Sequence, residues 1–359
     1  MTRVGFFGLP GSGKSTIFTA LTRQAVGPQF LGYDLKPHQA VVKIPDPRLE
    51  HVAELFKART TVHNTMEFMD IPGFDPTSTE RKLKNAVLEH YRRCDALALT
   101  VNLYDRSTAE QAASGMRAVL DELVLLGLIT AESCAARLSK AAAMKADDET
   151  VSRYKALSKV KDLLEEGTPM RRMNLEARER KLLREYAFIS GIPVIVVFNI
   201  SENDITKPVA EIPGMEQALN VARNEELSTV NIAASLEAEL AGMTDVEASE
   251  YMAEFGIDEP ALPRFIRAAF RSLGLLTFFT GSEKECRAWS LAAGSNAQSA
   301  AGVIHSDMAR GFIRAETVSY DDYVQYGGLA AAKAAGKVRL EGKEYIVSDG
   351  DVMTIRFNI

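Results

Sequence analysis

The chain has 359 residues and carries 42 Lys and Arg against 48 Asp and Glu, a net charge of −6. This length is enough for two or three domains. The net negative charge argues against a protein that binds nucleic acid through its overall charge, although a local basic face could still bind it. The three cysteines, Cys94, Cys134 and Cys286, are odd in number and far apart, which excludes a disulfide framework and gives no metal-ligand spacing.

Unpaired cysteines are typical of the reducing cytosol. No apolar run approaches the roughly 18 residues that a membrane-spanning helix needs. The N-terminus, Met1-Thr-Arg-Val-Gly5, enters a strand-like segment at once and leaves no room for a signal peptide. We therefore expect a cytoplasmic protein.

Strand-like and helix-like segments alternate in the first third of the chain. Residues 4–7 form an apolar run, a Gly/Pro loop follows, and residues 14–23 have the pattern of a helix. Residues 193–198 have the β-branched content of a strand that is buried on both faces of a parallel sheet. The other candidate strands lie at residues 40–44, 66–69, 96–101 and 229–232. Strands separated by helices predict an α/β sheet with right-handed crossovers.

The loop after the first predicted strand matches a phosphate-binding motif. Gly8-Leu-Pro-Gly-Ser-Gly-Lys-Ser15 satisfies G-x-x-x-x-G-K-[ST] between a strand and a helix. Its glycines allow the backbone to turn successive N–H groups toward one point. Lys14 supplies a positive charge to the β- and γ-phosphates, Ser15 supplies a hydroxyl to Mg²⁺, and the helix dipole favours the anion. The sequence predicts a nucleoside triphosphate site here.

A carboxylate follows the strand predicted at residues 66–69. Asp70 is followed by Ile71, Pro72 and Gly73, which gives the pattern D-x-x-G. In phosphoryl-transfer sites an aspartate at this place holds Mg²⁺ or its water, and the glycine N–H senses the γ-phosphate. A plain turn is the alternative, but the position one strand after the phosphate-binding loop favours the metal site.

The alternation of strands and helices stops between Asp105 and Tyr186. Apolar residues at helical spacing, together with many Ala, Leu, Glu, Lys and Arg, predict two or three helices inserted as a hairpin between two strands of the sheet. Residues 150–185 contain ten Lys and Arg against six Asp and Glu. A solvated helix face is the ordinary interpretation of such an excess, and a face that contacts RNA is the alternative.

Polar residues follow the buried strand in the pattern Asn199-Ile200-Ser201-Glu202. In GTPases this place carries Asn-Lys-x-Asp, whose aspartate accepts both donors on the guanine edge. Glutamate places its carboxylate one methylene further out, which fits guanine poorly. Adenine offers one amino donor and a ring acceptor, so the amide of Asn199 can face the purine while the carbonyl of Ile200 accepts from the amino group. An ordinary loop is the alternative interpretation.

The last 80 or so residues differ from the rest in their pattern of predicted elements. Strand-like runs lie at residues 277–280, 288–291, 345–347 and 352–357, and Asp349-Gly-Asp351 predicts a tight turn. These signals predict a small separate α+β domain. Its basic residues, Lys333, Lys337, Arg339 and Lys343, are spread over a predicted helix and the next strand.

These motifs together resemble those of the Obg-like ATPases of the YchF type, a branch of the translation-factor-related P-loop GTPases. The similar segments before the last domain are residues 8–16, 45–49, 65–73, 199–202 and 233–240. In the last domain they are residues 284–289, 300–305, 311–315 and 345–352. The resemblance spans nearly the whole chain and is weakest over residues 105–186, where the family has a helical insert.

The resemblance implies a fold and a division into domains. A Ras-like P-loop nucleotide-binding domain of α/β class is expected at residues 1–104 and 187–275, with the helical insert at 105–186. A ubiquitin-like α+β domain of the TGS type, found in ribosome- and RNA-associated proteins, is expected at 276–359.

The resemblance also implies a ligand and a partner. It predicts binding of ATP with Mg²⁺ in preference to GTP, slow hydrolysis, and association with the ribosome or ribosomal RNA, without a membrane or DNA partner. The nucleotide is expected to contact Gly11, Ser12, Gly13, Lys14, Ser15, Thr16, Gly73, Asn199, Ile200, Glu202, Ala233 and Ala234. The metal is expected at Ser15, Asp70 and Asp34. The basic residues of the last domain are either a solvated face or a contact with RNA phosphates.

This chain departs from the family pattern in its switch segments. Asp34 stands near the place of the family's Mg²⁺-binding threonine, and would add negative charge beside the phosphates. The segment from Phe74 to Glu80 is short and lacks the family's glycine-rich switch, and no histidine lies between His90 and His305. No residue of the sequence is thus an evident water-positioning group, and we name no catalytic residue.

The leading hypothesis is a regulatory P-loop ATPase whose nucleotide changes how the helical insert and the last domain engage a ribosome, with intrinsic hydrolysis very slow or lost. One alternative is a non-hydrolysing, nucleotide-gated sensor that binds the ribosome or RNA. Another keeps GTP as the ligand of a GTPase, with Glu202 rearranged to meet guanine.

Overall fold

The computed structural model describes residues 1–24, 37–72, 81–144 and 147–358. The chain divides into two compact units. The larger unit is formed by residues 2–40 and 67–268, and the smaller unit by residues 41–66 and 269–359 together with Met1. Within the described ranges, no helix combines the length and the apolar character needed to cross a bilayer.

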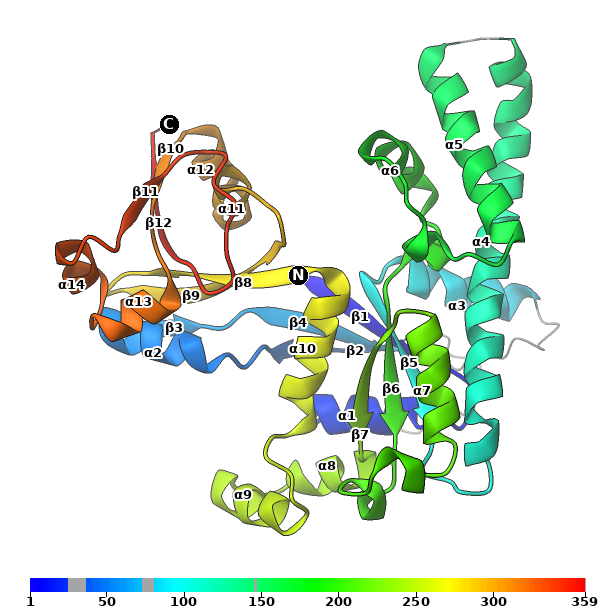
Figure 1. Cartoon of the computed structure of the whole chain (residues 1–359), viewed down its shortest axis with the longest axis horizontal. Coiled ribbons are helices and arrows are strands. Elements are labelled where there is room, and N and C mark those ends of the chain that lie inside the picture. Colours follow the sequence, from blue (N-terminus) through cyan, green and yellow to red (C-terminus); the bar gives the residue numbers. More distant parts are fainter. Residues whose placement is uncertain (25–36, 73–80, 145–146, 359) are drawn as a thin grey trace. The chain divides into compact units, whose positions relative to one another are not determined.

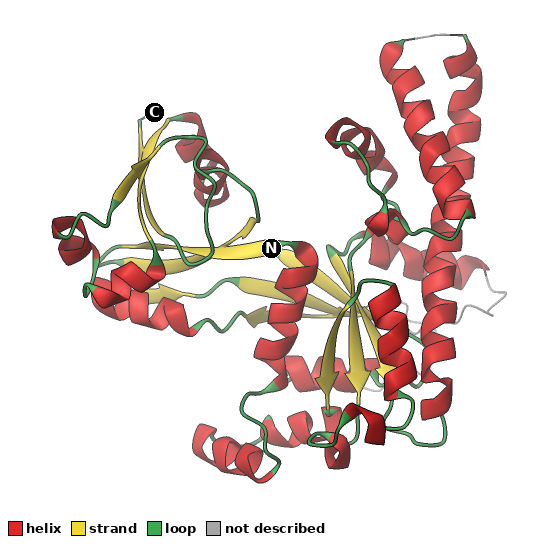
Figure 2. Ribbon diagram, in the orientation of Figure 1, coloured by secondary structure: helices red, strands yellow, loops and turns green. Residues whose placement is uncertain are grey.

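The larger unit is built on a sheet whose strands are drawn as arrows in Figure 2. The strands are β1 (Thr2–Phe7), β2 (His38–Lys43), β4 (Thr65–Asp70), β5 (Ala96–Asn102), β6 (Val194–Asn199) and β7 (Ser228–Ile232). They lie in the order β2-β4-β1-β5-β6-β7, and the pairs β1–β5, β5–β6 and β6–β7 are parallel. The chain order reverses between β1 and β5, and α/β sheets bind their ligands at such a point. The predicted α/β class is confirmed.

Helices cover both faces of this sheet. They are α1 (Lys14–Thr22), α3 (Arg81–Arg92), α4 (Ala112–Ala143), α7 (Met215–Asn224), α8 (Ala234–Leu240), α9 (Asp245–Glu254) and α10 (Ala261–Leu273). Because side chains alternate along a strand, Phe6 and Phe7 enter different cores. The Phe6 ring stacks on Phe265 of α10 with centroids 5.4 Å apart, and Phe7 meets Tyr91 of α3 edge-on at 5.6 Å.

The predicted helical insert is a hairpin of α4 and α5 (Asp148–Glu165), followed by α6 (Ala177–Leu183) (Figure 1). A small core that includes Ala131, Leu157 and Val160 lies between its helices. The side chain of Arg171 is 8% exposed and donates to Glu225, which follows α7, at 2.9 Å. The insert is therefore part of the larger unit.

Several basic residues of the insert pair with acids of the same unit. Arg153 contacts Glu149 and Glu185, and Lys159 contacts Glu179 at 2.9 Å. Together with the pairing of Arg171, these ion pairs agree with the ordinary interpretation of the excess, a solvated helix face.

The smaller unit is built on a second sheet. Its strands are β3 (Thr60–Val62), β8 (Leu275–Gly281), β9 (Glu285–Ala292), β10 (Phe312–Val318), β11 (Arg339–Glu341) and β12 (Val352–Phe357), in the order β11-β10-β12-β8-β9-β3. Its helices are α2 (Pro47–Phe56), α11 (Ala297–Ile304), α12 (Ser306–Arg310), α13 (Tyr320–Gln325) and α14 (Leu329–Ala334). Phe278 and Phe279 face opposite sides of β8, so each face has its own core.

One predicted strand of this unit is wrong, and the strands β3 and β10 are not among those predicted from the sequence. Residues 345–347 make only a single bridge, between Ile346 and Asn296. Val347 is nevertheless buried and donates its N–H to the carbonyl of Ser295 at 3.0 Å, so its apolar character reflects core packing in a loop. In contrast, β10 pairs with both β11 and β12.

The placement of residues 41–66 differs from the predicted division, which put them in the nucleotide-binding domain. They belong to the smaller unit. One reason is that β3 pairs in parallel with β9. Another is that Arg48 of α2 donates to Asp349 at 2.6 Å and to Asp46, the N-cap of the same helix, at 2.8 and 3.0 Å. Asp349 in turn accepts the Thr277 N–H at 2.8 Å.

Replacing Gly281 with alanine tests this placement. A Cβ there would lie 2.1 Å from the Phe56 ring of α2, so we expect the smaller unit to lose about 1–3 kcal/mol of stability by overpacking. Denaturant unfolding followed by the fluorescence of Trp289, the single tryptophan of the chain, measures the loss. Gly342→Ala is the control because a Cβ there would lie more than 4 Å from every atom in the part of the chain that the structure describes. Equal unfolding midpoints for the two variants would contradict the contact.

Candidate nucleotide-binding site

The phosphate-binding loop joins β1 to α1. Gly8, Gly11 and Gly13 have φ values of 143°, 75° and 89°, in the region that favours glycine. The conformations that the motif predicts for these glycines are therefore present. Gly13 is the N-cap of α1 and provides no side-chain cap, so the N–H groups of the first helical turn are left for an anion.

Lys14 is the first residue of α1, and its side chain lies over this loop. The residue is 8% exposed, and its Nζ donates to the carbonyl of Leu9 at 2.9 Å. Burial lowers the pKa of Lys14 to about 8, while the nearby Asp70 carboxylate acts in the opposite direction. The amine therefore lies beside the loop, and a bound phosphate would favour its charged form.

Ser15 and Asp70 meet next to Lys14. The Ser15 hydroxyl donates to Oδ2 of Asp70 at 2.6 Å. Asp70 is 1% exposed, and its Oδ1 is buried without a hydrogen-bond partner among the described residues. Burial raises the pKa of Asp70, against the effects of Ser15 and Lys14. The site therefore offers the Ser15 hydroxyl and a buried carboxylate with one unpaired oxygen. These groups fit Mg²⁺, which takes few protein ligands and completes its shell with water and phosphate.

Asp34, Gly73 and the segment from Phe74 to Glu80 lie outside the described residues. The roles predicted for Asp34 and Gly73 therefore remain predictions. Among the residues that are described, no group of three or more His, Cys, Asp or Glu side chains is arranged to hold a metal ion. Among the described residues, Ser15 and Asp70 are the predicted metal ligands that lie together.

The predicted base-binding residues come together at the ends of β6 and β7. The side chain of Asn199 lies against the phosphate-binding loop, because a Cβ on Gly13 would come within 2.3 Å of its Nδ2. Its Oδ1 accepts the N–H of Ala234 at 3.5 Å. Ile200 donates its N–H to the carbonyl of Ile232 at 3.0 Å. Asn199 thus links the phosphate loop to the segment that contains Ala233 and Ala234.

Glu202 has a partner that the sequence did not reveal. The hydroxyl of Ser235, in the first turn of α8, donates to Oε2 of Glu202 at 3.1 Å. The two residues are 33 positions apart, and no local motif signals the contact. The contact arises because the sheet places the ends of β6 and β7 side by side.

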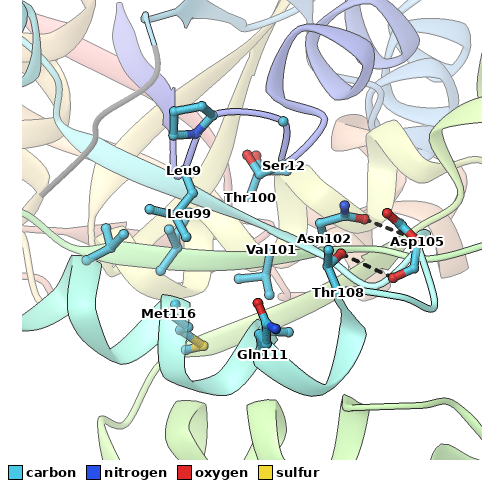
Figure 3. A pocket seen from close by; sticks show the side chains of 15 residues that line it. Leu9, Ser12, Leu99, Thr100, Val101, Asn102, Asp105, Thr108, Gln111 and Met116 are labelled. Atoms are coloured by element: carbon cyan, nitrogen blue, oxygen red, sulfur yellow. Dashed lines mark hydrogen bonds between the residues drawn. The ribbon is translucent and has the colours of Figure 1, made fainter. Parts of the chain in front are cut away.

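A cavity of about 380 Å³ adjoins the phosphate-binding loop (Figure 3). It is lined by residues 9–12, by 99–102 of β5, and by residues of the segment 105–119 that leads into α4. Among the described residues that line it, Asp105 is the one charged residue.

Asp70→Asn tests the metal assignment. The substitution keeps the shape of the side chain and removes its charge, so we expect the gain in ATP affinity on adding Mg²⁺ to fall by about tenfold or more. ATP titrations in Mg²⁺ and in EDTA measure this gain. Since burial penalises the charged form of Asp70, the unfolding midpoint should not fall.

Glu67→Gln is the matched control for Asp70→Asn, because it removes a carboxylate of the same strand that accepts from Arg3 at 2.8 Å. This variant should keep the full effect of Mg²⁺. An unchanged effect of Mg²⁺ in Asp70→Asn would refute the assignment.

A parallel α/β sheet, a glycine loop that leads into a helix with lysine and serine at its start, and an aspartate at the end of a neighbouring strand define a P-loop nucleoside triphosphatase. Residues 3–128 match the family model described as 50S ribosome-binding GTPase. Residues 275–358 match the model YchF-GTPase_C, which is described as a protein of unknown function.

Relatives cover the chain from end to end. It is 36% identical over 365 aligned positions to the ribosome-binding ATPase YchF of Bacillus subtilis and, equally, to that of Escherichia coli O157:H7, with 99% of each chain covered. The solved structure of the Schizosaccharomyces pombe YchF GTPase superposes with a TM-score of 0.84 at 26% identity and covers 99% of this chain and 97% of its own. The chain belongs to the YchF family, as its motifs predict.

Proposed function

We propose that this chain is a nucleotide-dependent regulatory ATPase that binds ATP with Mg²⁺ in preference to GTP, hydrolyses it slowly and acts at the ribosome in the cytoplasm. The observation that carries the proposal is the convergence of Lys14, the Ser15–Asp70 pair and Asn199 on one glycine loop. These groups supply what a triphosphate, its metal and a purine each require.

The phosphate end of the site stabilises negative charge. On binding, Lys14 exchanges its bond with the carbonyl of Leu9 for phosphate oxygens, and the N–H groups of α1 add the field of a helix N-terminus. Ser15 and Asp70 are the residues that would hold Mg²⁺, which when bound neutralises charge on the β- and γ-phosphates.

The base end supports adenine over guanine. Asn199 is fixed between Gly13 and Ala234, and Glu202 is bonded to Ser235 rather than free to face a base. The extra methylene of glutamate and this engagement both disfavour the two-point contact that guanine needs. ATP is therefore the proposed ligand.

Slow hydrolysis is proposed from the sequence. Phe74 follows the D-x-x-G pattern, at the place where other GTPases carry a water-orienting glutamine. A phosphate chain that is bound but lacks an oriented water is cleaved slowly unless a partner supplies the missing group.

The ribosome is proposed as the partner because relatives that match over 99% of both chains are named ribosome-binding ATPases. We propose that the smaller unit is a TGS-like domain. Its basic residues Lys333, Lys337 and Arg339 pair with Glu316, Asp322 and Glu341. Because these basic residues already have acidic partners, the proposed ribosome contact does not rest on this cluster alone.

Single-turnover hydrolysis of ATP, with and without purified ribosomes, tests the proposal, together with co-sedimentation in ATP and in ADP. We expect very slow hydrolysis that ribosomes accelerate and co-sedimentation that depends on the nucleotide. Nucleotide-dependent co-sedimentation without any hydrolysis would favour the non-hydrolysing sensor. Brisk hydrolysis by the protein alone, or co-sedimentation indifferent to nucleotide, would contradict the proposal.

A further inference from the structure

The loops after β6 and β7 are joined by two side-chain contacts. One is the acceptance of the Ala234 N–H by Asn199. The other is the hydrogen bond from the Ser235 hydroxyl to Oε2 of Glu202 at 3.1 Å, with both side chains partly buried. This second bond fixes the one carboxylate of the Asn199-x-x-Glu202 pattern, at the place where a purine base is proposed to bind.

Guanine and adenine make opposite demands on such a carboxylate. Guanine presents two adjacent donors, its N1–H and its 2-amino group, and a carboxylate binds both only when its two oxygens face the base together. Adenine presents one amino donor next to a ring nitrogen that is an acceptor. A carboxylate aimed at that edge would repel the ring nitrogen.

The bond to Ser235 restrains the direction in which Glu202 can face. A hydrogen bond to an ionised acceptor is stronger than one between neutral groups, so the hydroxyl holds Oε2 toward α8. Each carboxylate oxygen can accept more than one hydrogen bond, so the constraint concerns direction: to face guanine with both oxygens, the carboxylate has to turn out of the orientation that the bond to Ser235 favours. Binding of adenine does not require that rearrangement, because the carbonyl of Ile200 is the proposed acceptor for its amino group.

We propose that Ser235 is a specificity-determining residue, which keeps the Glu202 carboxylate from pairing with guanine and so shifts the site toward adenine nucleotides. The proposal rests on the proposed function, since it assumes that this site binds a purine nucleotide. Ser235 acts through Glu202 and is a positioning residue.

The test is a calorimetric measurement of the dissociation constants of ATP and GTP, with Mg²⁺, for the full chain and its variants. Ser235→Ala should shift the ratio of the two constants toward GTP by about five- to tenfold. Ser235→Thr retains a hydroxyl and should keep a ratio close to that of the unmodified chain.

Ser139→Ala is the control for the loss of a hydroxyl outside the base-binding segment. Ser139 lies in α4, and its hydroxyl donates to the carbonyl of Ala136 at 2.9 Å. This variant should leave the ATP-to-GTP ratio unchanged.

A double-mutant cycle separates the proposed role from a general effect on the fold. In the Glu202→Gln background, Ser235→Ala should leave the ratio unchanged, because the carboxylate that Ser235 restrains is gone. No shift in the single variant, or the same shift in both backgrounds, would overturn the proposal. The unmodified chain reports separately on the proposed function. A preference for GTP there would refute ATP as the ligand, while the cycle would still decide the role of Ser235.

Discussion

Replacing Gly13 with alanine is expected to weaken ATP binding by about a hundredfold or more. The φ of 89° at this residue is costly for any side chain, and the new Cβ would come within 2.3 Å of Nδ2 of Asn199. Relief of this clash must move either the start of α1, which carries the phosphate-binding N–H groups, or Asn199, which links the loop to Ala234. Both ends of the nucleotide site are disturbed by one methyl group.

Gly11→Ala is the matched control for that experiment. Its φ of 75° also favours glycine, but a Cβ there would meet no described residue within 4 Å. We expect a loss of no more than about tenfold, from backbone strain alone. Calorimetric titration of ATP into each variant measures both effects. Equal losses would show that Asn199 does not pack against the loop as described.

The affinity for ATP is expected to fall as the pH rises above about 8. In the free protein, burial lowers the pKa of Lys14 to about 8, so the amine is mostly charged below that pH and mostly neutral above it. Bound phosphate stabilises the charged form and raises the pKa. Binding above pH 8 must therefore take up a proton, and the affinity should fall by up to about tenfold for each further pH unit.

Titrations at pH 7, 8 and 9 in buffers of different ionisation enthalpy measure both the affinity and the proton uptake. Lys14→Arg is the control because arginine stays charged throughout this range. Whatever its absolute affinity, it should show no proton uptake in these titrations. An unmodified chain whose affinity is flat from pH 7 to 9 would contradict the poised amine at Lys14.

The phosphate-binding half of the site could be predicted because its signals are local. The glycines of the loop, Lys14 and Ser15 lie within eight consecutive residues, and their spacing requires a turn of the kind observed at Gly8, Gly11 and Gly13. Asp70 could be predicted as well, since an acidic residue at the end of a strand in a parallel sheet faces the same edge as the loop.

The remainder depends on contacts between residues distant in the sequence. Arg48 and Asp349 are 301 positions apart, and neither flanking segment contains a signal for the other. For this reason the sequence predicts residues 41–66 as part of the nucleotide-binding domain, whereas the structure groups them with the smaller unit. The engagement of Glu202 by Ser235 was missed for the same reason. Residues 345–347 have an apolar pattern that predicts a strand. This pattern reflects the burial of Val347, but it does not show whether the backbone pairs with a neighbouring strand.

Calorimetric titration of the purified full chain with ATP and with GTP, both with Mg²⁺, tests the central claim most directly. The convergence of Lys14, Asp70 and Asn199 on the glycine loop, with Glu202 held by Ser235, predicts binding of both nucleotides with ATP clearly tighter. Tighter binding of GTP would contradict the adenine assignment and leave a GTP-binding protein. Binding of neither nucleotide would contradict the nucleotide-dependent function itself.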